Sequence, residues 1–121
     1  MSSTRSIRRF GSERRLDLVF RALAGRPRRQ ILARLAQGPA TISELARPLR
    51  MSLPAVSRHV LVLERAGLLI RAIDGRVHHC TLGHTPFQEM NAWLAFYRPY
   101  WEGTLDALAR YAESETHGEP R

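Results

Sequence analysis

Apolar and polar residues alternate with the period of an α-helix through the first part of the chain. Between Ser12, a preferred N-cap residue, and Gly25, apolar residues fall at positions i, i+3, i+4 and i+7 and predict a first helix. A second helix is predicted with Pro27 in its first turn and a stop at Gly38 and Pro39. Each helix has one apolar face, so both are expected to pack against the core.

A third helix is predicted from a capping box, in which Thr41 is followed three residues later by Glu44. The apolar residues after it keep helical spacing. Pro48 lacks a backbone donor, so this helix is expected to be short and to end near Arg47.

A fourth helix is predicted to follow after a tight turn, with Ser52 as its N-cap. It is expected to run from residue 53 to residue 66, and Gly67 supplies the stop. The residues spaced to pack on the domain are Leu53, Val56, Val60 and Leu63. Two short helices joined by a tight turn form a helix-turn-helix.

After Gly67 the pattern changes from helical to extended. Residues 68–73 and 77–82 are two strand-like runs, and Asp74-Gly75 between them is a strong hairpin signal. A long last helix is predicted to open at Thr85, with large apolar residues at alternating spacings of three and four. Pro99 predicts a kink or break in it near residues 95–99.

The elements together predict a mainly α-helical fold with a small two-stranded antiparallel hairpin, which is a winged helix-turn-helix. The predicted organisation is a flexible basic arm at residues 1–11, one winged helix-turn-helix domain at residues 12–113, and a flexible tail at residues 114–121. A length of 121 residues suits one such domain.

Charge is distributed unevenly along the chain. The 19 basic residues are all arginine, the acidic residues number 11, and the formal net charge is +8. Residues 1–34 carry +8, residues 35–82 carry +3, and residues 83–121 carry −3. A genome rich in G and C would explain the missing lysine but not this polarity. The basic part of the chain therefore suggests a polyanionic partner.

The composition excludes several classes of protein. Cys80 is the single cysteine, so no internal disulfide forms and a cytoplasmic location is expected. No apolar run approaches the roughly 20 residues that span a bilayer, so we expect no association with membranes. The sequence has no glycine-rich phosphate loop, Ser/His/Asp set or paired carboxylates at useful spacing. We therefore expect neither an enzyme nor a cofactor.

Residues 44–68, ELARPLRMSLPAVSRHVLVLERAGL, resemble the helix-turn-helix of the ArsR/SmtB family of bacterial regulators. The aromatic pattern from Trp93 to Tyr111 resembles one subgroup of that family, and the resemblance covers residues 16–113. It implies a homodimeric winged-helix protein that represses its own operator and pairs through its first and last helices. Leu61 departs from relatives that often have a basic residue there.

The exposed face expected for the fourth helix has small residues near its N-terminal end, which would let it enter the major groove of duplex DNA. Arg58 can pair with guanine, while Arg71 and Arg76 flank the hairpin turn and suit phosphates or the minor groove. The residues expected to bind DNA are Ser52, Pro54, Ala55, Ser57, Arg58, His59, Arg65, Arg71 and Arg76. Arginines of the basic arm would either track phosphates or stay idle; they are Arg5, Arg8 and Arg9.

The first and last helices carry matching apolar stripes, so we expect a homodimer that presents two helix-turn-helix units to an inverted repeat. The residues expected at the dimer interface are Leu16, Val19, Phe20, Leu23, Leu94, Tyr97, Trp101, Leu105 and Leu108. Aromatic residues of the last helix could also line a pocket for an unidentified small-molecule effector, although core and dimer packing explain them more simply.

Histidines and the cysteine near the hairpin raise the question of a metal site, because both residue types bind zinc. The resemblance implies metal residues on the third or last helix, yet residues 45–47 lack thiols and residues 86–113 contain no His or Cys. We therefore expect a repressor that does not sense metal at the known family sites. Two alternatives stay open: a metal- or thiol-responsive sensor that uses Cys80 with His78 or His84, and a protein-interaction module on the same scaffold.

Overall fold

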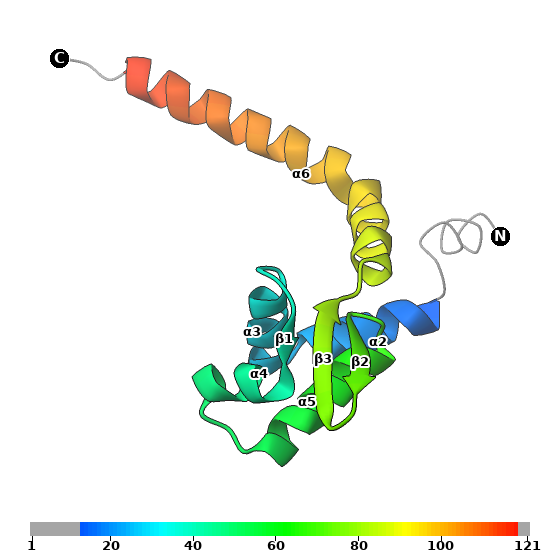
Figure 1. Cartoon of the computed structure of the whole chain (residues 1–121). Helices are drawn as coiled ribbons and strands as arrows, with labels where there is room; N and C mark the ends of the chain where they lie inside the picture. The colour runs from blue at the N-terminus through cyan, green and yellow to red at the C-terminus, as the bar shows by residue number, and fades with distance from the viewer. Residues whose placement is uncertain (1–12, 119–121) are drawn as a thin grey trace.

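The computed structural model describes residues 13–118, with side chains described up to residue 115. Its elements are α2 (Glu13–Leu23), α3 (Arg26–Leu35), β1 (Ala40–Thr41), α4 (Ile42–Leu49), α5 (Leu53–Arg65), β2 (Leu69–Asp74), β3 (Val77–Leu82) and α6 (Thr85–Gly118). Figure 1 shows α2 to β3 gathered into one body, from which α6 runs outward. The predicted winged helix-turn-helix is confirmed.

The predicted hairpin forms, and a third strand joins it. β2 pairs antiparallel with β3 from Leu69 opposite Leu82 to Asp74 opposite Val77, and Gly75 takes the left-handed conformation at φ 64° in the turn. The expectation of two strands is corrected, because β1 pairs with the other edge of β3 and gives the order β1-β3-β2. A strand of two residues is too short to show an alternating pattern in the sequence.

The capping box at the start of α4 is confirmed on both sides. The Thr41 amide donates to Glu44 Oε1 at 2.9 Å, and the Glu44 amide donates to Thr41 Oγ1 at 3.2 Å. The expected end near Arg47 is corrected, since α4 continues through Pro48 to Leu49. Proline in the last turn removes one donor without preventing the turn from closing. Arg50 caps the end of the helix with a left-handed backbone at φ 55°.

The core lies where α2, α3, α4 and α5 meet one another and the strands. Three of the four inner positions predicted for α5 are fully buried: Val56, Val60 and Leu63. The prediction was wrong for Leu53, which is 51 % exposed. It is the first residue of α5, one turn before Val56, and it lies beyond the edge of the core.

The last helix is bent but unbroken. Figure 1 shows α6 changing direction about where its colour passes from yellow to orange, and the helix is continuous through Pro99. Pro99 cannot donate to the carbonyl of Ala95, which accounts for a bend of the kind expected there. The helix also continues to Gly118, beyond the domain end expected at residue 113.

Parts of the predicted organisation lie outside the described residues. These are the basic arm at residues 1–11, the helix cap at Ser12 and the last three residues of the tail. Within residues 13–118, no helix combines the length and apolar character needed to cross a membrane.

Candidate nucleic-acid interface

The start of α5 is fixed by its cap and by its buried face. Ser52 Oγ accepts a hydrogen bond from the Ala55 amide at 3.3 Å, as the N-cap position requires. Because Val56, Val60 and Leu63 point inward, the opposite side of the helix faces solvent. Of the residues predicted to bind DNA, those exposed on or beside α5 are Ser52, Pro54, Arg58 and Arg65, while Ala55 and Ser57 are half-buried.

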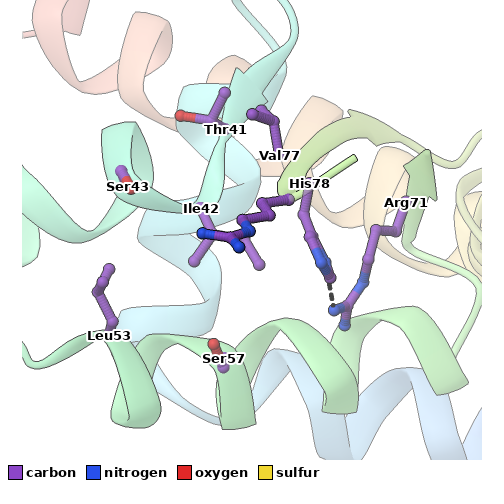
Figure 2. A pocket seen from close by; sticks show the side chains of 9 residues that line it. Thr41, Ile42, Ser43, Leu53, Ser57, Arg71, Val77 and His78 are labelled. Carbon is purple, nitrogen blue, oxygen red and sulfur yellow. Dashed lines mark hydrogen bonds between the residues drawn. The ribbon is translucent and has the colours of Figure 1, made fainter. Parts of the chain in front are cut away.

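A cleft of about 460 Å³ separates the first half of α5 from the hairpin and the start of α4. Figure 2 shows Leu53 and Ser57 entering it from α5, with Val77 and His78 on the hairpin side. Its lining residues are Thr41, Ile42, Ser43, Leu53, Ser57, Arg71, Arg76, Val77 and His78. Hydroxyl groups, apolar side chains and two arginines therefore line one open groove, which suits a ligand with both phosphate and apolar edges.

The structure brings Ser57 and Arg76 together in this cleft, as a shared DNA site would require. Sequence reasoning missed the α4 side of it, which consists of Thr41, Ile42 and Ser43. The capping box located the start of α4, but nothing in the sequence shows that the two-residue strand beside it pairs with β3. Arg76 is exposed next to the Gly75 turn, at the tip of the hairpin.

Arg71, which the sequence predicts to contact DNA, is held by partners within the protein. Its side chain is only 15 % exposed, and Nη2 lies 2.9 Å from Glu64 Oε1 on α5. Nη1 lies 3.1 Å from Nδ1 of His78, and Figure 2 shows these two side chains turned toward each other. Both terminal nitrogens of Arg71 therefore already have partners within the protein, and its contact with DNA stays a prediction. The sequence placed Arg71 beside the hairpin turn but did not show this ion pair.

His59 is also held by the protein itself rather than presented freely. Its Nδ1 lies 3.2 Å from Nη1 of Arg28 on α3, and the side chain is half-buried. Partial burial and then the nearby guanidinium groups of Arg28 and Arg58 lower the pKa of His59 below its ordinary value of 6.5. His59 therefore joins α5 to α3, a role that its place on the flank of the helix did not reveal.

The residues predicted for the dimer interface fall into two groups. Leu16 and Val19 are 4 % and 3 % exposed within the single chain, and Leu23 packs against the core, so these three contribute little free surface. Phe20 instead meets Trp93 edge-on, with ring centroids 5.3 Å apart. The exposed members of the predicted set are Phe20, Leu94, Tyr97, Trp101, Leu105 and Leu108.

The residues considered for a metal site are dispersed. Cys80 is fully buried in β3, and burial, the largest cause, raises the pKa of its thiol. His78 bonds to Arg71, and His84 is exposed. Among the residues that the structure describes, no three His, Cys, Asp or Glu side chains gather closely enough to hold a metal ion.

Comparison with known proteins agrees with this geometry. A family model described as "Bacterial regulatory protein, arsR family" matches residues 26–71, from α3 through the start of β2. The chain is similar to the HTH-type transcriptional regulator Rv2034 of Mycobacterium tuberculosis, with 50 % identity over 99 residues that cover 82 % of this chain and 90 % of that protein. It is also similar to the transcriptional repressor SdpR of Bacillus subtilis, with 29 % identity over 65 % of this chain and 88 % of that protein.

Solved structures show the same fold. A crystal structure of the ArsR family transcriptional regulator RHA00566 superposes with a TM-score of 0.70 and 42 % identity, covering 75 % of this chain and 94 % of that one. The homodimeric winged helix-turn-helix DNA-binding domain of Mb0332 from Mycobacterium bovis has a TM-score of 0.57 at 23 % identity, covering 71 % and 82 %. The second likeness is one of fold alone.

Proposed function

This chain belongs to the ArsR family of bacterial regulatory proteins and is a transcriptional regulator, and we propose that it acts as a homodimeric repressor of an inverted-repeat operator. The observation that carries the proposal is the groove between α5 and the hairpin, which Ser57 and Arg76 both line beside the exposed face of α5. SdpR, to which the chain is similar, is described as a transcriptional repressor, and this supports repression rather than activation.

In this proposal α5 is the recognition helix, and it lies in the major groove of duplex DNA. Pro54 and Ala55 leave room near its N-terminal end for close approach to the bases. Arg58 is exposed and pairs with the O6 and N7 atoms of a guanine. Arg65, the last residue of the helix, reaches a flanking phosphate.

The hairpin is the wing, and its tip supplies a second contact. Arg76 beside the turn meets the phosphate backbone or the adjacent minor groove. Leu53 and Val77 give the groove an apolar lining, which suits the methyl group of a thymine. Bases would thus be read mainly from α5, while the wing adds affinity without much sequence preference.

A second copy covers the exposed apolar side chains of α2 and α6 in the proposed dimer. Phe20, Tyr97 and Trp101 belong to this surface, and large exposed apolar patches are typical of interaction sites. A two-fold axis there would place the two recognition helices about one turn of DNA apart, roughly 34–36 Å. Such a dimer matches the symmetry of an inverted repeat. The proposed place of action is the cytoplasm, where the bacterial chromosome lies.

Regulation in this proposal does not use metal at the known family sites. The segment at 45–47 has no thiol and the segment at 86–113 has no His or Cys. Buried Cys80, with its raised pKa, is poorly suited to act as a thiolate ligand or sensor. An effector of this protein would then be a small molecule other than a metal ion.

A footprint on the protein's own upstream region tests the proposal. We expect protection of a two-fold symmetric site, and binding that weakens roughly 10³- to 10⁵-fold between 50 and 200 mM salt if 6–10 phosphates are contacted. Equal affinity for unrelated duplexes of the same length, or binding that is insensitive to salt, would contradict the proposal. A partner protein captured without any footprint would favour the interaction-module alternative.

A further inference from the structure

Glu64, Arg71 and His78 link three elements through one guanidinium group. Arg71 on β2 donates from Nη2 to Glu64 Oε1 on α5 at 2.9 Å and from Nη1 to His78 Nδ1 on β3 at 3.1 Å. The third nitrogen, Nε, is buried without a hydrogen-bond partner. Within the described part of the chain, no other buried side-chain nitrogen or oxygen lacks a partner in this way. All three nitrogens of Arg71 are thus engaged or enclosed, and little of the side chain faces solvent.

This contact lies where the wing leaves the body of the protein. Arg71 is paired in register with Cys80, which is fully buried, whereas residues 72–77 beyond it are all exposed. A two-stranded hairpin is marginally stable by itself, so its free end needs side-chain contacts to hold a fixed direction. The ion pair with Glu64 supplies such a contact to the recognition helix itself.

We propose that Arg71 is a positioning residue which, held by Glu64 and His78, sets the distance between the wing and the recognition helix. The proposal rests on the proposed function. Arg76 at the wing tip and Arg58 on the helix contact one duplex together only if that distance is kept. Arg71 therefore contributes to DNA affinity through the wing, without contacting DNA.

The direction in which Glu64→Gln changes operator affinity distinguishes a positioning role of Arg71 from a purely electrostatic effect. Removing a negative charge near a polyanion site ordinarily strengthens binding, because repulsion of the phosphates is lost. Glu64→Gln removes such a charge but also weakens the hold on Arg71. Asp74→Asn is the matched control, since it removes a charge from the wing turn while Asn-Gly remains a favoured turn pair.

The test is the operator affinity of the full chain and its variants, with thermal unfolding measured alongside. We expect Glu64→Gln to weaken binding roughly tenfold, as loss of a hydrogen bond to a charged group would, whereas Asp74→Asn binds as tightly as the parent or more tightly. Arg71→Lys keeps the charge but not the planar fork, so it is expected to weaken binding with an unchanged salt dependence. An unaltered unfolding temperature in Arg71→Lys would show that the loss of operator affinity does not come from a destabilised fold.

A double-mutant cycle completes the test. If Arg71 acts through the wing tip, Arg71→Lys costs clearly less affinity in an Arg76→Ala background than in the parent. Additive effects, or Glu64→Gln binding as tightly as Asp74→Asn, would overturn the positioning role while leaving the proposed function intact. A parent protein that binds no operator would instead overturn the proposed function and the positioning role with it.

Discussion

Arg28 and His59 are joined across two helices, with Nη1 of the arginine 3.2 Å from Nδ1 of the histidine. Arg28 also donates from Nε to the Ala22 carbonyl at 2.6 Å and from Nη2 to the Arg21 carbonyl at 3.1 Å. One guanidinium group thus ties the end of α2, which carries part of the proposed dimer surface, to the recognition helix. An arginine has no acceptor, so the bond to His59 requires an unprotonated Nδ1.

This contact predicts a loss of stability in acid. The folded protein lowers the pKa of His59, so the unfolded chain binds the proton more tightly. The contribution of His59 to the free energy of unfolding is therefore complete above its ordinary pKa of 6.5 and is lost as the pH falls through the lower folded value. Urea unfolding at a series of pH values between about 8 and 5 measures this dependence.

Two variants isolate His59 in that measurement. His59→Gln offers an oxygen acceptor to Arg28 and does not titrate, so its stability should depend less on pH than that of the parent. His79→Gln is the control, because His79 is exposed on the hairpin, and its pH dependence should match the parent. If the free energy of unfolding varied with pH equally in all three proteins, the Arg28–His59 contact would not be linked to protonation of His59.

Arg58→Ala is expected to relax sequence preference more than it reduces affinity. The lost guanine contact should cost about 1–3 kcal/mol of discrimination at one base pair of each half-site and little elsewhere. Binding to the operator and to its single-base variants measures this. Arg110→Ala, on the exposed distal part of α6, removes the same charge and should leave the preference unchanged. A uniform loss over all variants would make Arg58 a phosphate contact.

Gly83→Ala is expected to destabilise the fold strongly. A Cβ atom at Gly83 would lie 2.0 Å from the backbone oxygen of Gly67, while the Gly83 amide donates to the Leu68 carbonyl at 2.8 Å. The close approach of two backbones leaves no side chain to move aside, so we expect a loss of about 2–4 kcal/mol in the free energy of unfolding.

Gly103→Ala is the matched control for that substitution. Gly103 lies within α6 and a Cβ there meets nothing within 4 Å, so alanine should stabilise the helix by about 0.5–1 kcal/mol. Denaturant unfolding of both variants gives the comparison. Equal and small changes at the two positions would mean that the packing between Gly67 and Gly83 is looser than the structure places it.

Local signals predicted the elements well because their causes are local. Thr41 and Glu44 form both bonds of their capping box, and Asp74-Gly75 forms the turn, since each depends on residues a few positions apart. Strand β1 escaped prediction because its partner, β3, lies far along the chain. The same distinction applies to the site.

Helical periodicity gave the exposed face of α5 but not the partners of the site residues. Arg58 is exposed on α5 as predicted, yet the periodicity could not show that Arg71 reaches Glu64 or that His59 reaches Arg28. These contacts depend on how the elements pack. The predicted burial of Leu53 was wrong for a related reason, because an apolar residue at the end of an inner face need not lie over the core.

Leu108→Glu is expected to dissociate the proposed dimer without unfolding the protomer. Leu108 lies on the distal part of α6 and is 58 % exposed, so within one chain a carboxylate there remains hydrated. In the dimer it would be buried without a partner, which would cost several kcal/mol of association free energy. Sedimentation velocity over a range of protein concentrations should show a dimer for the parent and a monomer for the variant.

Ile73→Glu makes the same change of charge and character on the wing, outside the proposed interface. Ile73 is 64 % exposed, and this variant should remain dimeric. The Leu108→Glu monomer should keep the helical circular dichroism of the body but bind the operator weakly, because each half-site is then bound without the other. A dimer that persists in Leu108→Glu at low micromolar concentration would show that the distal half of α6 lies outside the interface, and would confine pairing to the region around Phe20 and Tyr97.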